Sequence, residues 1–194
     1  ETWRADVGRS LSDAERQHLV QREQAIQQVR EIDRDTRWKQ ARDRAEEIWA
    51  KAEIVPLDHP YLERKSVRAY GLKADSSRLV VPLRIGQTLH SLQFIYATGD
   101  KRFLTGGRKK GCYHLIGEPG EVLCVAEGYA TAASIYEATG YAVAVAFDAG
   151  NLQPVGMELA NRYPDARLLF CADDDRMTES NPGVSKATNA AEAT

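Results

Sequence analysis

Acidic side chains recur at three points in the C-terminal part of the sequence, and each point directly follows a short apolar run. The acids are Glu127 after the run 122–126, Asp148 after the run 141–147, and Asp173, Asp174 and Asp175 after the run 167–172. Carboxylate oxygens are hard ligands that suit Mg²⁺, which also keeps waters and is completed by substrate phosphates. Alternate residues point the same way where a chain leaves a strand, so Asp173 and Asp175 can converge with Glu127 on one ion while Asp174 joins a second. The pattern predicts a magnesium site.

Acids that follow strands can also cap the helices that come next. For Asp148 this interpretation and the metal-site interpretation both stay open. Three adjacent aspartates repel one another strongly without a cation, which favours the metal site at 173–175.

A second candidate site is a stretch of cations around the glycine pair Gly106-Gly107. No acid occurs between residues 101 and 117, and the cations are Lys101, Arg102, Arg108, Lys109 and Lys110. Glycines let a backbone approach an anion, cations neutralise it, and Phe103 and Tyr113 offer aromatic faces. This combination is typical of sites for single-stranded nucleic acid or a triphosphate tail. A solvated basic hairpin is an equally open interpretation.

The acids are carried by a predicted β-α-β-α-β unit. The apolar runs 122–126, 141–147 and 167–172 are predicted strands, and the segments 131–139 and 152–162 have helical patterns. Continuous apolar strands separated by helices imply an α/β fold with a parallel sheet covered on both faces and a site along the carboxyl ends of the strands. Gly128, Gly150 and Asn151 lie at that edge, where the backbone is expected to pass close to the site. No glycine-rich phosphate loop follows the first strand, which disfavours dinucleotide binding.

Two further regions precede this unit. Residues 56–118 contain the apolar-rich runs 78–83 and 89–96, which predict strands in a smaller basic α+β subdomain. Residues 1–55 predict one or two long charged helices that begin at the capping box of Ser12 and Glu15 and that Pro56 terminates. Their narrow apolar stripe consists of Leu19, Ile26, Val29, Trp38, Ala41, Ala45, Ile48, Trp49 and Ala52. Arginines alternate with acids in this segment, so we interpret it as a packing strut with a solvated face and assign it no chemistry.

Charge separates the same three regions, although the formal net charge is only −2. Residues 1–55 carry 11 basic and 12 acidic side chains, residues 56–118 carry 11 and 5, and residues 119–194 carry 4 and 11. A basic region beside an acidic one suggests a polyanion held next to a carboxylate-rich site that needs cations. Ordinary patchiness of charge is the open alternative.

Composition limits the class of protein. A chain of 194 residues that is 43% hydrophobic is not mostly disordered. No stretch is long and apolar enough to cross a bilayer, and no apolar signal core opens the chain, so we expect a cytoplasmic protein without membrane contact. Cys112, Cys124 and Cys171 lack the spacing for a disulfide framework or a zinc site. A chain that starts without Met and stops inside a helical pattern is expected to be a fragment.

Two motifs resemble those of a known family. The segment Glu127-Gly128-Tyr129-Ala130-Thr131-Ala132 is similar to the Glu-Gly-Tyr-Ala-Thr-Ala motif of DNA primases of conjugative plasmids and satellite phages. Ala172-Asp173-Asp174-Asp175, followed by Asn181-Pro182-Gly183 and Lys186-Ala187, is similar to their second acidic motif, and together the two mark a Toprim domain. Similarity to the basic subdomain of these primases extends the match to residues 45–194, through the segments 48–49, 59–62, 71–72, 101–104 and 111–117.

The resemblance implies magnesium-dependent, template-directed synthesis of short RNA primers on single-stranded DNA, with Mn²⁺ as an alternative ion. It implies that Glu127, Asp173 and Asp175 are catalytic and bind the metal, with Asp174 as a further ligand. The residues expected to bind template or nucleoside triphosphates are Lys101, Arg102, Arg108, Lys109, Lys110 and Lys186. A replicative helicase is a further candidate partner.

The resemblance also implies a Toprim-like Rossmannoid sheet in residues 119–194, C-terminally incomplete, after the basic subdomain 56–118 and the helical segment 1–55. The zinc-binding module usual at the start of bacterial primases has no ligand set here. A Toprim-type nuclease, a topoisomerase fragment and a non-catalytic nucleic-acid-binding module stay open as alternatives, and the basic subdomain favours the primase.

Overall fold

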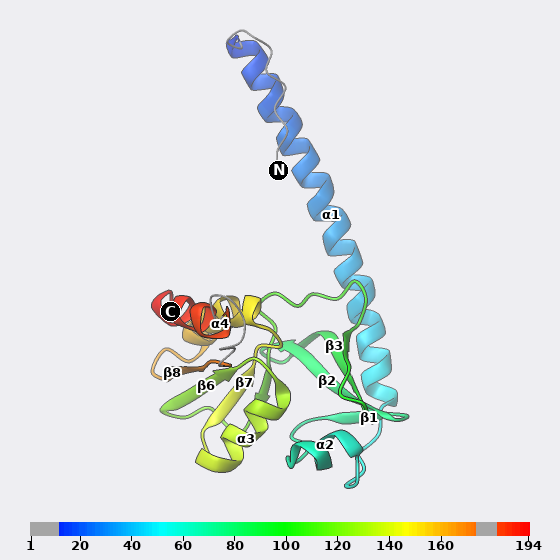
Figure 1. Ribbon diagram of the computed structural model, residues 1–194. Helices are drawn as coiled ribbons and strands as arrows, with labels where there is room; N and C mark the ends of the chain where they lie inside the picture. The colour runs from blue at the N-terminus through cyan, green and yellow to red at the C-terminus, as the bar shows by residue number, and fades with distance from the viewer. Residues whose placement is uncertain (1–11, 174–181) are drawn as a thin grey trace.

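The computed structural model describes residues 12–173 and 182–194. It consists of two β-sheets that share a core, with a long helix, α1, that projects from them (Figure 1). Among the described residues, no helix has both the length and the apolar character needed to span a membrane.

The first sheet is antiparallel and contains four strands in chain order. They are β1 (Lys73–Asp75), β2 (Arg78–Ile85), β3 (Thr88–Tyr96) and β4 (Lys101–Phe103). The short helix α2 (Pro60–Lys65) precedes them, and His59 caps it by accepting a hydrogen bond from the backbone of Tyr61. Strands were predicted at 78–83 and 89–96, where the apolar residues lie. Strand β4 was not predicted, because its pairing with β3 depends on backbone contacts of a segment that reads as a basic loop.

The second sheet has the order β5-β7-β6-β8. Its strands are β5 (His114–Ile116), β6 (Val122–Ala126), β7 (Ala142–Val145) and β8 (Arg167–Cys171). β6 is parallel to β7 and to β8, as predicted, and β5 adds an antiparallel edge. The proposed division at residue 118 assigns β5 to the basic subdomain, although β5 pairs within this second sheet.

Helices cover both faces of the second sheet. Cys124 and Ala126 of β6 face the core that contains α3 (Tyr129–Thr139). Leu123 and Val125 face the core that contains α4 (Leu152–Arg162) and α5 (Pro182–Glu192). Alternate residues of a strand point to opposite faces, so a fully apolar strand needs cover on both sides. The predicted α/β fold is confirmed.

Helix α1 spans Asp13–Lys51, and at 1.5 Å per residue it is about 58 Å long. The predicted capping box is present, because the backbone amide of Glu15 donates to the Ser12 side chain and the backbone amide of Ser12 donates to the Glu15 carboxylate at 2.9 Å. The helix ends before Pro56, at Lys51, because Glu53 leaves it to form a β-bridge with Ala74.

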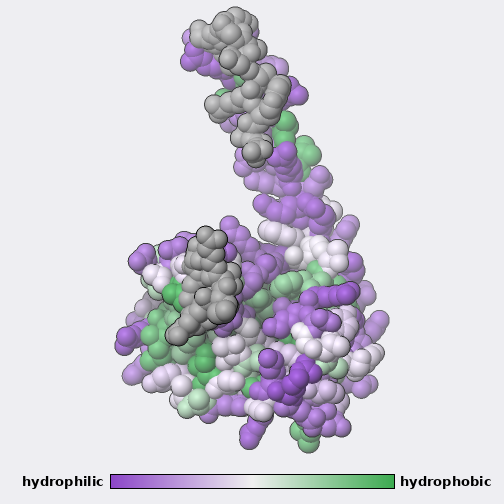
Figure 2. Space-filling model, viewed as in Figure 1, coloured by the Kyte–Doolittle hydropathy of each residue, from purple (hydrophilic) through white to green (hydrophobic). Residues whose placement is uncertain are grey.

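Only the C-terminal part of the apolar stripe of α1 is buried. Ala41 and Ala45 are fully buried in the described structure, and α1 packs there against β3. Leu19, Ile26 and Val29 are exposed, and Figure 2 shows that the projecting part of the helix is mainly hydrophilic. Burial therefore supports the predicted packing role for the last third of the helix, and for the rest of the helix this role stays a prediction.

One core joins the two sheets. Leu79, Val81 and Ile95 of the first sheet lie in the same buried cluster as Val143 and Val145 of the second. A β-bridge joins Arg84 of β2 to Tyr113, the residue directly before β5. The relative position of the two sheets is thus fixed by packing and by backbone hydrogen bonds.

His114 of β5 lies within this junction. Its Nε2 atom is 2.8 Å from the carbonyl oxygen of Tyr70, and the side chain is buried. Desolvation lowers the pKa of His114 from 6.5 to about 4, although the hydrogen bond to Tyr70 acts in the opposite direction. The imidazole is therefore neutral in the folded protein at neutral pH.

We predict that His114 makes the protein less stable in mild acid. The unfolded chain binds a proton at His114 below about pH 6.5, whereas the folded chain does so only near pH 4, so the free energy of unfolding falls as the pH drops through this window. The contribution reaches at most about 1.4 kcal/mol per pH unit. Urea titrations between pH 4 and pH 7.5 should give a shallower slope for His114→Gln than for the parent. His18→Gln, on the exposed part of α1, should keep the parent slope; equal slopes for the parent and His114→Gln would contradict the assignment.

Candidate metal and nucleic-acid site

Two of the predicted acids lie at the same edge of the second sheet. Glu127 directly follows β6, and Asp173 follows β8, the parallel neighbour of β6. The register pairs Ala126 with Cys171, so both chains leave the sheet at the same level. Both side chains are half-buried, and the Oε1 atom of Glu127 is shielded from solvent.

The two described carboxylates, Glu127 and Asp173, suit a divalent ion. Carboxylates from two adjacent strand ends are hard oxygen ligands, and Mg²⁺ needs only one or two of them beside water and phosphate. Within residues 12–173 and 182–194, no group of three or more His, Cys, Asp or Glu side chains is placed to hold a metal ion. Asp174 and Asp175 lie outside the described residues, so their predicted convergence with Glu127 and Asp173 stays a prediction.

A cationic cavity of about 550 Å³ opens beside these acids. Its lining includes Asp173, Gly128 at the start of α3, and Lys101 of β4. A Cβ atom built on Gly128 would lie 3.6 Å from the Nζ atom of Lys101, so the lysine reaches across to the strand end that carries Glu127. Desolvation and the charge of Lys65 lower the pKa of Lys101, and Asp173 acts in the opposite direction. The first sheet thus brings a cation to the acidic edge of the second.

Arg64 and Lys65, from the last turn of α2, also line this cavity. They were not predicted from the sequence, because they lie outside the longer basic stretch that begins at Lys101. Arg64 is anchored by a hydrogen bond of 2.9 Å from its Nη1 atom to the carbonyl oxygen of Ala97. The only available signal was their position in the region of residues 56–118, where cations outnumber acids.

Arg102 does not line the cavity with Lys101. Neighbouring residues of a strand point to opposite faces, and the Arg102 guanidinium lies 5.9 Å from the ring centre of Tyr96, beside a different pocket. The structure therefore does not bring Arg102 together with Glu127 and Asp173.

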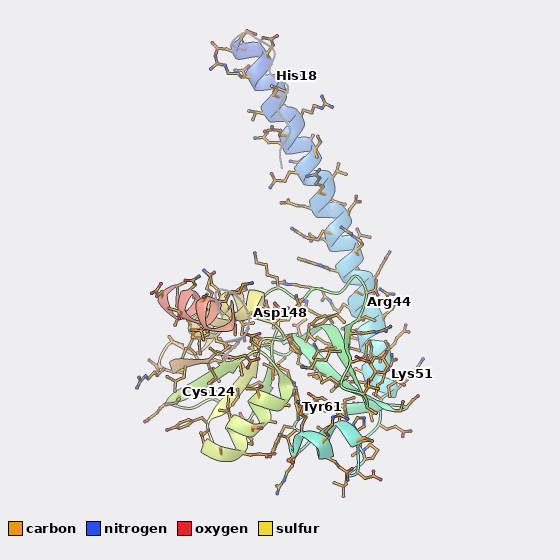
Figure 3. All side chains as sticks on the ribbon, viewed as in Figure 1. His18, Arg44, Lys51, Tyr61, Cys124 and Asp148 are labelled. Carbon is orange, nitrogen blue, oxygen red and sulfur yellow. The ribbon has the colours of Figure 1, made fainter. Side chains whose placement is uncertain are left out.

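Residues 104–113, here called the basic loop, run from β4 to β5 and cross from α1 toward α4 (Figure 1). At one end, Arg44 of α1 donates a hydrogen bond of 2.8 Å to the carbonyl oxygen of Thr105. Further along, Lys109 forms an ion pair with Asp148, which follows β7. Arg44 and Asp148, both labelled in Figure 3, mark the two sides between which the loop is held.

The helix-cap interpretation of Asp148 is wrong, and its interpretation as a metal ligand stays a prediction. Its side chain makes no cap hydrogen bond to the short helix that follows, and its observed partner is Lys109. Lys109, which was predicted to bind phosphate, thus forms an ion pair within the protein.

The amide of Asn151 fixes the basic loop to the second sheet. Its Oδ1 atom accepts a hydrogen bond of 2.8 Å from the backbone of Gly111, and its Nδ2 atom donates to the carbonyl oxygens of Cys112 at 3.0 Å and Ala146 at 2.8 Å. Asn151 is buried, so these bonds have no competition from water. Asn151 was expected to lie near the site; its hydrogen bonds give it a structural task there.

The remaining predicted cations lie around the same edge. Lys186 of α5 is exposed, and its Nζ atom would be 3.9 Å from a Cβ built on Gly150. The same Cβ would lie 3.2 Å from Asp148 Oδ1, so a side chain at Gly150 would be crowded. Lys110 is exposed, and Arg108 lies with its guanidinium carbon 5.3 Å from the ring centre of Trp38 in α1.

The thiols near this region are poor nucleophiles. Burial raises the pKa of Cys112 to about 12 and that of Cys124 to about 11. Both stay protonated at neutral pH, and the thiolate is the reactive form.

Comparison with known proteins places the second sheet in a family. Residues 121–194, which include β6, β7 and β8, match the model of the Toprim domain. Two Escherichia coli proteins, both called DNA primase TraC, are similar to the whole chain. One is 33% identical over 213 residues, covering 99% of this chain and 14% of the relative, and the other is 34% identical over 207 residues, covering 98% and 19%.

The resemblance to Toprim DNA primases of the plasmid type is therefore confirmed, and the chain spans less than a fifth of the length of these two relatives. A solved structure of bacteriophage T7 lagging-strand DNA polymerase with primase domains of two gp4 subunits, bound to an RNA/DNA hybrid and dTTP, was also matched. That match has 12% identity and a TM-score of 0.42 and covers 74% of each chain, which does not establish a common fold.

We predict that Asn151→Ala destabilises the protein by roughly 2–4 kcal/mol, because it leaves a buried amide and two buried carbonyls without their partner. Urea unfolding at pH 7.5 measures the change, and tryptic cleavage after Lys109 or Lys110 should become faster. Asn161→Ala, at an exposed position of α4, serves as the control and should leave both unchanged. Parent-like stability of Asn151→Ala would show that the loop does not depend on this amide.

Proposed function

We propose that this chain is the catalytic core of a DNA primase that makes short RNA primers on single-stranded DNA in the cytoplasm. The observation that supports this most directly is the acidic edge of the Toprim sheet, with Glu127 and Asp173, facing the cationic cavity lined by Lys101. Its two relatives called DNA primase TraC support the same assignment.

The metal part of the proposal rests on the donor set. Toprim primases use divalent metal ions as a class, and we propose Mg²⁺ here, with Mn²⁺ as an alternative. Glu127 and Asp173 would hold it together with Asp175, and Asp174 would be a further ligand. Bound there, two such ions would lower the pKa of a primer 3′-hydroxyl and stabilise the departing pyrophosphate.

The cations of the chain would bind the polyanionic reactants. Lys101, with Arg64 and Lys65, is placed in the cavity beside Asp173 and suits the triphosphate of an incoming nucleotide. Lys110 and Arg108 on the basic loop suit the template, and Lys186 suits a phosphate at the edge near Gly150. Lys109 would act mainly by holding the loop, because Asp148 already neutralises it. A replicative helicase is proposed as a further partner.

We predict that Glu127→Gln and Asp173→Asn each reduce primer synthesis more than 100-fold. Each change removes a negative charge that a divalent ion needs, while size and shape are kept. The assay contains single-stranded DNA, labelled nucleoside triphosphates and Mg²⁺, and resolves the products on a denaturing gel. Glu118→Gln, at an exposed position before β6, should keep the parent activity.

The same gel separates the alternatives. New short oligonucleotides made by the parent and not by Glu127→Gln support the primase. A shortened template without new oligonucleotides would identify a Toprim-type nuclease. Template binding without any Mg²⁺-dependent product would leave a binding module and overturn the catalytic proposal.

A further inference from the structure

A groove of about 510 Å³ lies between α1, the basic loop and α4, away from the cavity at Asp173. Its lining comes from all three elements and includes Trp38 of α1, Arg108 and Lys110 of the basic loop, and Pro154 and Met157 of α4. Met157 is half exposed and gives the groove an apolar side next to its cations.

One face of α1 is directed at this groove. Arg34, Trp38 and Arg42 are four residues apart, so they lie on one side of the helix. The Trp38 ring has the Arg34 guanidinium carbon at 4.7 Å and that of Arg108 at 5.3 Å from its centre. This part of the helix thus presents an aromatic ring within a cluster of arginines from two elements.

The positive charge of the groove is not matched by the acids of its lining. Among the described residues that line it, Glu158 is the one acid, and it is paired with Arg162 at 2.7 Å. Next to the groove, the Nε atom of Arg42 is buried and has no hydrogen-bond partner in the described part of the chain. Desolvation lowers the pKa of the nearby His90, and the charges of Arg108 and Arg42 lower it further. Arg34 is paired with Asp35 at 3.1 Å, whereas Arg42, Arg108 and Lys110 have no carboxylate partner among the described residues.

We propose that this groove binds single-stranded DNA, with phosphates at Arg108, Lys110 and Arg42 and a base against Trp38. Cations beside an aromatic face fit a flexible strand whose bases are unpaired, because stacking needs an open base face and the phosphates need closely placed charges. The proposal rests on the proposed function and extends it, since it gives the N-terminal helix a role in holding the template.

The position of the groove fits a path toward the acidic edge. The basic loop lines the groove with Arg108 and Lys110, and its Lys109 is held by Asp148 at the end of β7. A strand that lies along the loop is therefore led from α1 toward the carboxyl ends of the Toprim strands.

The test measures binding of a fluorescein-labelled oligo(dT) by anisotropy, in EDTA and at several salt concentrations, so that no catalytic step is involved. Trp38→Ala should weaken binding about 5- to 150-fold, and Trp38→Phe should recover most of the affinity. Arg42→Gln should weaken binding several-fold and reduce the slope of log Kd against log salt by about one. Arg22→Gln makes the same charge change on α1 about 30 Å from Arg42 along the helix and should have no effect.

A second measurement does not depend on variants. An oligonucleotide with 5-iodouracil in place of thymine is cross-linked to the parent protein by light, and the adduct is mapped after cleavage at acidic residues. The expected adduct is in the segment 36–43, which contains Trp38 and Arg42.

Parent-like binding by Trp38→Ala and Arg42→Gln would contradict the proposal that the groove binds single-stranded DNA. Cross-links confined to other segments would contradict it as well. Equal competition by duplex DNA would overturn the assignment to single strands. If the binding results are as expected but no primers are made, DNA binding in the groove is supported and the primase proposal is contradicted. If Glu127→Gln abolishes primer synthesis but the groove variants bind DNA like the parent, the primase proposal is supported and DNA binding in the groove is contradicted.

Discussion

The core shared by the two sheets is the constraint on which the rest of the structure depends. Leu79, Val81 and Ile95 of the antiparallel sheet are buried against Val143 and Val145 of the Toprim sheet. Because protein cores are close-packed, neither sheet can shift without opening a void. The consequence is electrostatic: the edge strand β4 is held so that Lys101 reaches the carboxyl ends of β6 and β8. Lys101 and Asp173, which are far apart in the sequence, line the same cavity because apolar packing fixes the relative position of the two sheets.

Much of the Toprim sheet could be predicted from sequence, since its strands carry their own signal. The strand Val122–Ala126 is apolar at every position because both of its faces are covered, and its predicted bounds equal the observed ones. The edge strand β4 carries no such signal. β4 is the charged segment Lys101–Phe103, and only its pairing with β3 makes it a strand. The stripe on α1 shows the converse limit, because helical periodicity predicts a possible contact face but not whether a partner is present.

The acids of the site were easier to select than the groups that hold it together. Glu127 and Asp173 stand directly after apolar strands, and this local pattern is visible in the sequence. The local sequence around Asn151 contains no pattern that predicts its hydrogen bonds. Its hydrogen-bond partners Gly111 and Cys112 lie 40 and 39 positions away, so its task exists only in the folded chain. Hydrogen bonds between residues far apart in the sequence set the geometry of the loop, and no local sequence pattern predicts them.

The cations of the basic stretch do not share one surface. Lys109 is neutralised by Asp148, and Arg102 lies on the other face of β4, against Tyr96. Lys101 faces the acidic edge, whereas Arg108 and Lys110 line the groove beside α1. A single basic segment is thus divided into an anchor and two separate cationic surfaces. Because this division follows from strand alternation and from one ion pair, in the proposed primase a triphosphate at Lys101 and a template at the groove would be bound on different surfaces.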